Sequence, residues 1–374
     1  MIQDLLEYFN PLDYLEIWLT VAFLIAFFMS YSSFPAIFNV AEAKHLMDEP
    51  NDRSIHSIKT PTLGGISIYL SLVLVITTTG ALLDTKILLL LLGGLTILFF
   101  LGLKDDLLIL SPKKKLLGQF LAAGLLIVFT DTRILGLSGL FGITILPYWI
   151  SVSFTFFVYL LLINAYNLID GVDGLAGLLA LFASAAFAFV FIQIQDISMA
   201  TIAVGLIGAL IPFLRLNFSS KRKIFMGDTG SMIIGFLIAF FIVRFIGYSQ
   251  THGEAEFHNS GPILSLAIVF FPLIDTLRIF FVRVVIHKKS PFKADKNHLH
   301  HRFLELGYSH VRTTVSIVLI NIVIMVFAYL MKDIDIHLQT ILLLVMGSFL
   351  YAVFFIWNHL SNGFIKSRAI KQSH

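Results

Sequence analysis

The chain has 374 residues, of which 57% are hydrophobic and only 13% are charged, and its mean hydropathy is +0.89. This composition excludes an ordinary soluble domain and indicates a protein that crosses a membrane several times. The net charge of +3 does not argue for nucleic acid as a partner, and none is expected. The absence of cysteine excludes disulfides, thiolate metal sites and a cysteine nucleophile.

Hydrophobic runs predict an all-α fold with about eleven transmembrane helices, because about 17 to 25 apolar residues suffice to cross the hydrocarbon core. Acidic residues precede the first run, which favours a retained span over a cleaved signal peptide. Segment 131–148 is apolar but broken by glycines, and we expect a hairpin or interfacial segment outside the cell. The predicted spans are 16–38, 63–82, 87–103, 116–130, 149–164, 175–192, 197–214, 231–247, 262–282, 313–331 and 338–357.

The basic residues predict the orientation of these spans. Of the 26 lysines and arginines, 22 fall in the connections that follow odd-numbered spans. The positive-inside rule places those connections in the cytoplasm, with the N-terminus outside and the C-terminus inside. We therefore predict one domain over residues 1–374 in the inner (cytoplasmic) membrane, with an active site that faces the cytoplasm. Its functional loops are expected near 39–62, 104–115, 164–174, 215–231 and 283–312.

The loops after the first and the third predicted spans carry candidate phosphate ligands. Arg53 and Lys59 flank a histidine, and a Gly-Gly pair follows them, so they form either an ordinary juxtamembrane loop or a phosphate or sugar site. Asp105 and Asp106 repel each other unless a cation is present. Because Lys115 follows within ten residues, the pair suits an anionic lipid phosphate and a group that accepts its proton or holds a metal. A solvated helix end is the alternative for the pair.

The most informative segment is Asn164-Ala-Tyr-Asn-Leu-Ile-Asp-Gly-Val-Asp-Gly174, which directly follows an apolar run. Unpaired polar groups at such a junction are costly unless they bind something. Amide and carboxylate oxygens are hard ligands that suit Mg²⁺. Gly171 and Gly174 allow sharp turns and the close approach of a ligand. The segment predicts a polar ligand site at a membrane face.

Two later loops complete the set. Asp228 lies between glycines just before the eighth span, where a helix start directs N–H groups at an anion, although Asp228 also suits a helix cap. The segment His298-Leu-His300-His301-Arg302 suggests zinc, but adjacent histidines without cysteine fit a closed zinc site poorly. A clamp for a diphosphate is at least as well supported. Asn217 is a further polar candidate in the loop that leads to Asp228.

Taken together, these groups have the composition of a phosphoryl-transfer site for a lipid substrate, where positioning and charge neutralisation do the work. A transporter would place ionisable residues near the middle of the spans, which are almost free of them. An intramembrane metalloprotease would need a His-Glu-x-x-His pattern, which the sequence lacks.

Motifs in this order resemble those of the polyprenyl-phosphate N-acetylhexosamine-1-phosphate transferases. The resemblance extends from about Arg53 to Arg312, and the His-Leu-His-His-Arg form is similar to the branch that starts O-antigen, enterobacterial common antigen or teichoic-acid linkers. The matches are Pro61-Thr-x-Gly-Gly65, Asp105-Asp106, Pro112-x-x-Lys115-x-x-x-Gln119, Asn164-x-x-Asn167-x-x-Asp170-Gly-x-Asp173-Gly-Leu, Lys223-Ile-Phe-Met-Gly-Asp228-x-Gly-Ser231 and His298-x-His300-His301-Arg-x-x-x-x-Gly307.

The resemblance implies transfer of a sugar 1-phosphate from a UDP-N-acetylhexosamine to undecaprenyl phosphate in the lipid bilayer, with release of UMP. UDP-GlcNAc is the favoured donor, and the GalNAc, QuiNAc, FucNAc and MurNAc-pentapeptide derivatives are alternatives. Mg²⁺ is the implied cofactor, with Mn²⁺ as a substitute, and a homodimer is compatible with the family.

The resemblance also implies roles for individual residues. Asn167 and Asp228 would hold Mg²⁺, and Lys115 would meet a phosphate. Asp105 and Asp106 would place or deprotonate the lipid phosphate, or assist the metal. Asp170 and Asp173, with Gly171, would line the nucleotide pocket, and His300, His301 and Arg302 would hold the diphosphate or sugar end; Asp170, His300 and His301 are counted among the catalytic candidates. The remaining substrate-binding candidates are Arg53, Lys59, Asn164, Asn217 and His298. Two positions depart from the family pattern, because Ile109 replaces a third acid and Leu178 replaces a glycine.

Overall fold

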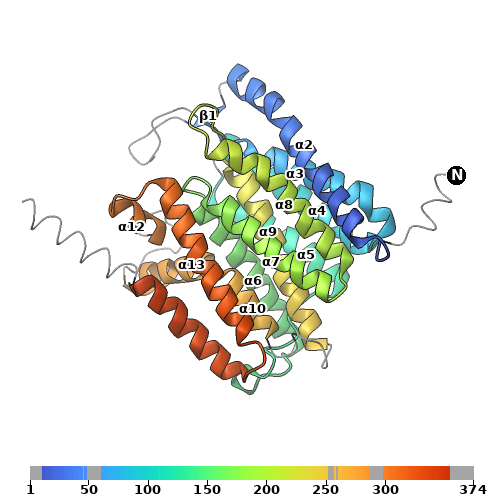
Figure 1. Cartoon of the computed structure of the whole chain (residues 1–374), viewed down its shortest axis with the longest axis vertical. Helices are drawn as coiled ribbons and strands as arrows, with labels where there is room; N and C mark the ends of the chain where they lie inside the picture. The colour runs from blue at the N-terminus through green and yellow to red at the C-terminus, as the bar shows by residue number, and fades with distance from the viewer. Residues whose placement is uncertain are drawn as a thin grey trace, which may run out of the picture.

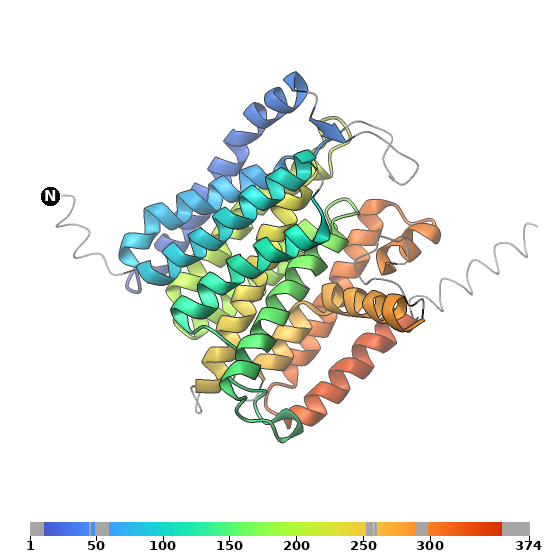
Figure 2. The same ribbon diagram turned by 180° about the vertical axis from the view of Figure 1, so that it is seen from behind.

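The computed structural model describes residues 11–44, 46–48, 60–108, 110–251, 257, 260–286, 288 and 298–353. Within them the chain forms a bundle of long helices (Figures 1 and 2). The helices are α2 (Leu15–Ala43), α3 (Gly64–Thr79), α4 (Thr85–Leu108), α5 (Pro112–Thr130), α6 (Tyr148–Ile169), α7 (Leu175–Gln193), α8 (Ile197–Asn217), α9 (Gly227–Thr251), α10 (Gly261–Ile268), α11 (Phe270–Phe281), α12 (Leu299–Glu305), α13 (His310–Leu330) and a helix over Ile336–Val353.

Short elements connect these helices. Strands β1 (Met47–Asp48) and β2 (Thr60–Pro61) pair antiparallel, with Met47 opposite Pro61. Single helical turns lie at Gly80–Leu82 and Leu140–Gly142, and a π-helical turn at Val282–Ile286 extends α11. The described residues therefore form an all-α fold apart from this one two-residue ladder.

Among the described residues, nine helices are long and apolar enough to cross a membrane, or ten if the bent pair α10 and α11 forms one span. This confirms a helical, multi-pass membrane protein. Helix α5 occupies the predicted fourth span but is not among those ten, and three lysines lie in its first turn. The total of eleven spans and the orientation of the termini therefore stay predictions.

The predicted ninth span is not a straight helix. It breaks between α10 and α11 and bends by 80°, so that α11 lies across its neighbours (orange, Figure 2). Pro272 explains the break, because it has no N–H to give to the carbonyl of Ile268 four residues earlier. Asn321 of α13 repairs the backbone: its Nδ2 donates to the Ile268 carbonyl at 2.9 Å, and its Oδ1 accepts from the Phe271 N–H at 3.0 Å.

Helix α9 forms the centre of the bundle. In its most apolar 18-residue window 89% of the residues are buried, whereas the corresponding figure for the peripheral α2 is 28%. The hairpin predicted for segment 131–148 is present, since the Leu146 N–H donates to the Leu135 carbonyl at 2.7 Å. It lies at the end of α9 opposite to Asp228, so the start of α9 places that carboxylate centrally at the other end of the bundle.

Candidate active site

Five polar side chains from four helices meet at the start of α9. Asp105 and Asp106 lie in the last turn of α4, and Lys115 lies in the first turn of α5. Asn167 lies in the last turn of α6, and Asp228 lies in the first turn of α9. We call these five residues the acid cluster. The sequence separates its members by up to 123 positions, and the bundle brings them within hydrogen-bonding distance.

Lys115 is the cation of the acid cluster and contacts two of its carboxylates. Its Nζ lies 2.6 Å from Asp228 Oδ2 and also forms an ion pair with Asp105. Asn167 Nδ2 donates to Asp228 Oδ1 at 2.6 Å. The ammonium group thus lies between two carboxylates, so this place in the structure already favours positive charge. A phosphate that approached Lys115 would find the same cation available for a charge-assisted bond.

Asp106 fixes the backbone that carries Asp228. Its Oδ1 accepts from the Asp228 N–H at 2.7 Å, and its Oδ2 accepts from the Thr229 N–H at 3.1 Å and from Thr229 Oγ1 at 2.6 Å. The first N–H groups of a helix have no partner within the helix, and a carboxylate placed there also meets the positive end of the helix dipole. Asp106 therefore acts as a cap for α9 supplied by a different helix.

Glycines let the neighbouring backbones close on this helix start. A Cβ on Gly65 would lie 2.6 Å from Gly230 Cα, and one on Gly102 would lie 2.6 Å from Thr229 N. Gly227 has φ of +72°, and a Cβ there would lie 2.8 Å from both carboxylate oxygens of Asp106. Three backbone bonds join the strip 61–65 to residues 225–226: Gly64 N–H to the Phe225 carbonyl, Gly65 N–H to the Met226 carbonyl, and Phe225 N–H to the Pro61 carbonyl.

A second group of charges holds the loop after α6. Asp173 Oδ2 lies 2.6 Å from Lys223 Nζ and 3.1 Å from His310 Nδ1. Burial alone would raise the pKa of the Asp173 carboxyl, but the hydrogen bonds from His310 and Lys223 lower it below its ordinary value. Its other oxygen, Oδ1, is buried without a hydrogen-bond partner. Asp173 is therefore a carboxylate with one acceptor atom still available to a ligand.

The pKa of Asp170, three residues before Asp173, shifts in the opposite direction. Burial raises the pKa of the Asp170 carboxyl well above its ordinary value, and the carboxylates of Asp106 and Asp173 add to the effect. Protein atoms enclose Asp170 on most sides, although part of its surface remains accessible. Neighbouring carboxyl groups with diverging pKa values are typical of active sites.

A third group lies where α11 approaches α12. Asp275 Oδ2 lies 2.8 Å from His298 Nδ1, and Asp275 Oδ1 accepts from the Leu299 N–H at 2.8 Å. One ligand atom each from Asp275, His298 and His300 lies within 4.8 Å of the others. We call these three buried residues the histidine cluster. Both oxygens of Asp275 are already acceptors, so it orients the histidines and is poorly placed as a metal ligand.

His300 links the histidine cluster to the loop after α6. A Cβ on Gly171 would lie 3.7 Å from His300 Nε2, so the two motifs meet. His300 is 1% exposed, and its Nδ1 is buried without a hydrogen-bond partner. Burial lowers the pKa of His300 to about 3, although Asp275 opposes the shift. His300 is therefore neutral near pH 7.

The other predicted site residues take structural or peripheral positions. Asn164 Nδ2 donates to Gln119 Oε1 at 2.9 Å. Asn217 accepts from the Gly174 N–H at 2.5 Å and donates to the Ile224 carbonyl at 2.7 Å, so it clamps two loops together. Arg302 pairs on the surface with Glu305, 3.0 Å away. The ring of His301 lies 4.5 Å from that of His300, centroid to centroid. Arg53 and Lys59 lie outside the described residues.

The glycine predictions have a mixed outcome. Gly174 has φ of +71°, which favours glycine at the start of α7, as the sequence predicted. Gly171 is not among the described residues with positive φ. A Cβ at Gly171 would lie 3.7 Å from His300 Nε2, which is an ordinary contact, so neither φ nor space requires glycine there.

Sequence reasoning missed three residues that shape the site. Thr229 bonds to Asp106, His310 bonds to Asp173, and Asp275 orients His298. Asp275 gave a usable signal, because an acid inside an apolar run is rare unless it has a function. His310 and Thr229 gave none, since their partners lie more than 100 residues away.

The donor set of the acid cluster fits a hard divalent cation. Asp228 offers carboxylate oxygens and Asn167 an amide oxygen, and a half-turn of that amide would exchange its Nδ2 for Oδ1 beside Asp228. Lys115 shows that a cation between these carboxylates is compatible with the fold. The histidine cluster fits a hard cation less well, because the hydrogen bonds of Asp275 use both of its oxygens.

The chain is similar in sequence to known proteins. The model of glycosyl transferase family 4 matches residues 88–246. The chain is 28% identical over 347 residues, 91% of its own length and 93% of the relative's, to a probable undecaprenyl-phosphate N-acetylglucosaminyl 1-phosphate transferase of Bacillus subtilis. It is 30% identical over 286 residues, 75% of each chain, to an undecaprenyl-phosphate alpha-N-acetylglucosaminyl 1-phosphate transferase of Escherichia coli O157:H7. The chain therefore belongs to glycosyl transferase family 4 and is a phosphotransferase.

Proposed function

We propose that this protein transfers GlcNAc 1-phosphate from UDP-GlcNAc to undecaprenyl phosphate and releases UMP. The names of its relatives support the acceptor and the sugar. The observation that carries the proposal is the acid cluster, in which one lysine, one amide and three carboxylates from four helices converge at one end of a membrane bundle.

The reaction follows from this arrangement. An oxygen of the lipid phosphate attacks the phosphorus next to the sugar, and the bond between that phosphorus and the bridging oxygen of UMP breaks. Asn167 and Asp228 would hold Mg²⁺, which would supply charge neutralisation on the diphosphate. Lys115, which pairs with both Asp105 and Asp228, binds a phosphate oxygen. Asp106 keeps Asp228 in place.

The protein contacts favour direct transfer over a covalent phospho-aspartate. Both oxygens of Asp106 already accept hydrogen bonds, and Asp105 pairs with Lys115 while it accepts from the Leu110 N–H. A phosphate monoester is largely ionised at neutral pH, since its second pKa is about 6, so it needs little help from a general base. A phosphoryl group trapped on Asp105 or Asp106 would overturn this mechanism.

The loop after α6 and the histidine cluster are suited to bind the nucleotide and the sugar diphosphate of the donor. Asp173 Oδ1 and His300 Nδ1 are buried polar atoms without hydrogen-bond partners among the described residues, and the His300 ring lies beside Gly171. Buried polar atoms are normally satisfied, so these two are the best candidates for contacts with the nucleotide and the sugar diphosphate. The basic residues at this end of the bundle support a site at the cytoplasmic face, where nucleotide sugars are available.

The test is UMP release by the purified full-length protein. We expect release from UDP-GlcNAc that requires both Mg²⁺ and undecaprenyl phosphate, and that EDTA abolishes and Mn²⁺ restores. The GalNAc, QuiNAc, FucNAc and MurNAc-pentapeptide donors, assayed side by side, decide the sugar. Absence of UMP release with every donor would exclude the transferase reaction and favour a transporter.

A further inference from the structure

A cation-lined groove lies outside the candidate active site, between α2 and α8. Its cavity of about 460 Å³ is lined by Tyr31, Phe34 and Phe38 of α2 and by Arg215, Lys221 and Arg222 at the end of α8 and in the loop after it. None of its lining residues is acidic. The groove therefore combines an aromatic floor with a positively charged mouth.

The three cations have no carboxylate partner among the described residues. Arg215, Lys221 and Arg222 are exposed, and no ion pair of the described chain includes them. Ser219 shapes their loop, because its Oγ accepts from the N–H groups of Lys221 at 3.3 Å and Arg222 at 3.2 Å. Three adjacent cations without an acid repel one another, so an external anion would stabilise this arrangement.

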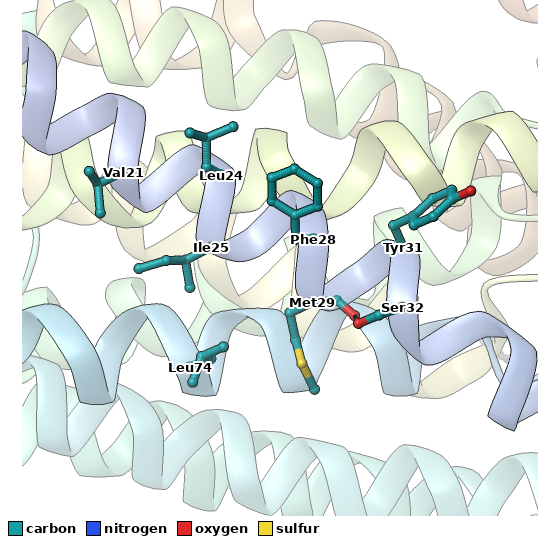
Figure 3. Close-up of a pocket in the computed structure, with 8 residues that line it drawn as sticks. All are labelled: Val21, Leu24, Ile25, Phe28, Met29, Tyr31, Ser32 and Leu74. Atoms are coloured by element: carbon teal, nitrogen blue, oxygen red, sulfur yellow. Dashed lines mark hydrogen bonds between the residues drawn. The ribbon is translucent and has the colours of Figure 1, made fainter.

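The apolar floor continues along α2 away from the cations. A second cavity of about 530 Å³ meets the first at Tyr31, which lines both. Figure 3 shows Leu24, Phe28 and Tyr31 in succession along one side of α2. Pro35 and Phe38 continue the same helical stripe toward the cations. At 1.5 Å per residue the stripe from Leu24 to Phe38 is about 21 Å long, which exceeds the roughly 15 Å depth of one leaflet.

We propose that this groove binds one anionic phospholipid, with its headgroup phosphate on Arg215, Lys221 and Arg222 and an acyl chain along the α2 stripe. The charge of the mouth and the length and apolar character of the floor match the two parts of such a lipid. The bound lipid would stabilise the loop 218–226, whose Lys223 holds Asp173. The inference is independent of the proposed reaction, because lipid retention is its readout.

The acceptor lipid is a poorer fit to the groove. A reacting phosphate has to reach Lys115 and Asp228, which lie on α5 and α9, whereas the groove lies on α2 and α8 and contains none of the acid cluster. A bound phospholipid needs only cations for its phosphate and an apolar surface for its acyl chain, and the groove offers both.

The experiment counts lipids on the intact protein. Full-length protein in phosphatidylcholine nanodiscs with increasing fractions of phosphatidylglycerol is analysed by native mass spectrometry. We expect the native protein to retain one phosphatidylglycerol. Arg215→Gln with Arg222→Gln should weaken retention by about 25-fold, at roughly fivefold per cation. Leu216→Trp, which fills the cavity without changing its charge, should also displace the lipid.

The matched control is Lys44→Gln with Lys86→Gln, which removes two exposed cations that line neither cavity. It should retain the lipid, and melting in pure phosphatidylcholine shows that every variant folds. Equal loss in the control would overturn the proposal. Displacement by undecaprenyl phosphate at equal concentration would identify the groove as an acceptor site, and displacement by glycerol phosphate would reduce it to a phosphate site, so either result contradicts the proposal.

Discussion

The acid cluster and the histidine cluster are positioned in different ways, although both lie at the same end of the bundle. The acid cluster uses the ends of four long helices whose backbones touch through glycines, and its charges pair with one another. The histidine cluster joins a bent helix to the seven-residue helix α12 through hydrogen bonds of Asp275 to His298 and Leu299. Helix packing and paired charges therefore position the first site, whereas hydrogen bonds to a buried carboxylate position the second.

The largest effect should come from the carboxylate at the centre of the acid cluster. Asp228→Asn keeps the shape but removes the charge that pairs with Lys115 and suits a metal. We expect UMP release to fall by about a thousandfold, the scale of a lost charge-stabilising group in an active site. Asp131→Asn, at the opposite end of the bundle, is the control. If UMP release fell less than tenfold in Asp228→Asn, Asp228 would not be a catalytic residue.

The next effect tests whether packing positions that carboxylate. A methyl group at Gly65 would press on the backbone of Gly230, so Gly65→Ala must displace the start of α9. We expect destabilisation by about 1 to 3 kcal/mol and a loss of activity of about a hundredfold. In Gly124→Ala the new methyl meets only ring atoms of Phe156, the nearest at 3.7 Å, so this variant should retain both stability and activity. Similar behaviour of the two variants would show that the contact at Gly65 is not limiting.

A smaller effect should follow from releasing the histidine cluster. Asp275→Asn keeps the volume but weakens the bond that orients His298. We expect activity to fall by about 10- to 100-fold, the usual range for a group that orients a functional residue. Nitrogen-15 NMR of the histidines should show a changed tautomer of His298, which a purely structural loss would not produce. Asp196→Asn, which breaks an ion pair with Arg244 far from the site, is the control.

The same contrast explains what could be predicted from the sequence. The motifs predicted the members of the acid cluster, because each stands at the end of an apolar run and the runs form helices as expected. The break at Pro272 was missed, since an apolar run reads as one span and the compensating Asn321 lies far along the chain. The structural use of Asn217 was also missed, because composition cannot distinguish an amide that clamps two loops from one that contacts a ligand.

The smallest effect is a pH dependence of stability that belongs to the histidine cluster. Burial lowers the pKa of His300 from 6.5 to about 3, so folding favours the neutral ring. The stability that depends on this neutral ring is complete above pH 6.5 and declines as the pH falls from 6.5 toward 3, because only the unfolded chain takes up the proton there. At pH 5.5 the loss should be about 1.4 kcal/mol, the value of one pKa unit.

His300→Gln cannot take up that proton, so its melting temperature should fall less than that of the native protein between pH 7 and pH 5.5. His337→Gln is the control, because it replaces a histidine that is about half exposed at the other end of the bundle. Equal slopes for the native protein and His300→Gln would mean that His300 is accessible to protons in the folded state. The histidine cluster would then be open to solvent in the folded state. It would also be held less firmly than the packed acid cluster, by more than the burial of His300 indicates.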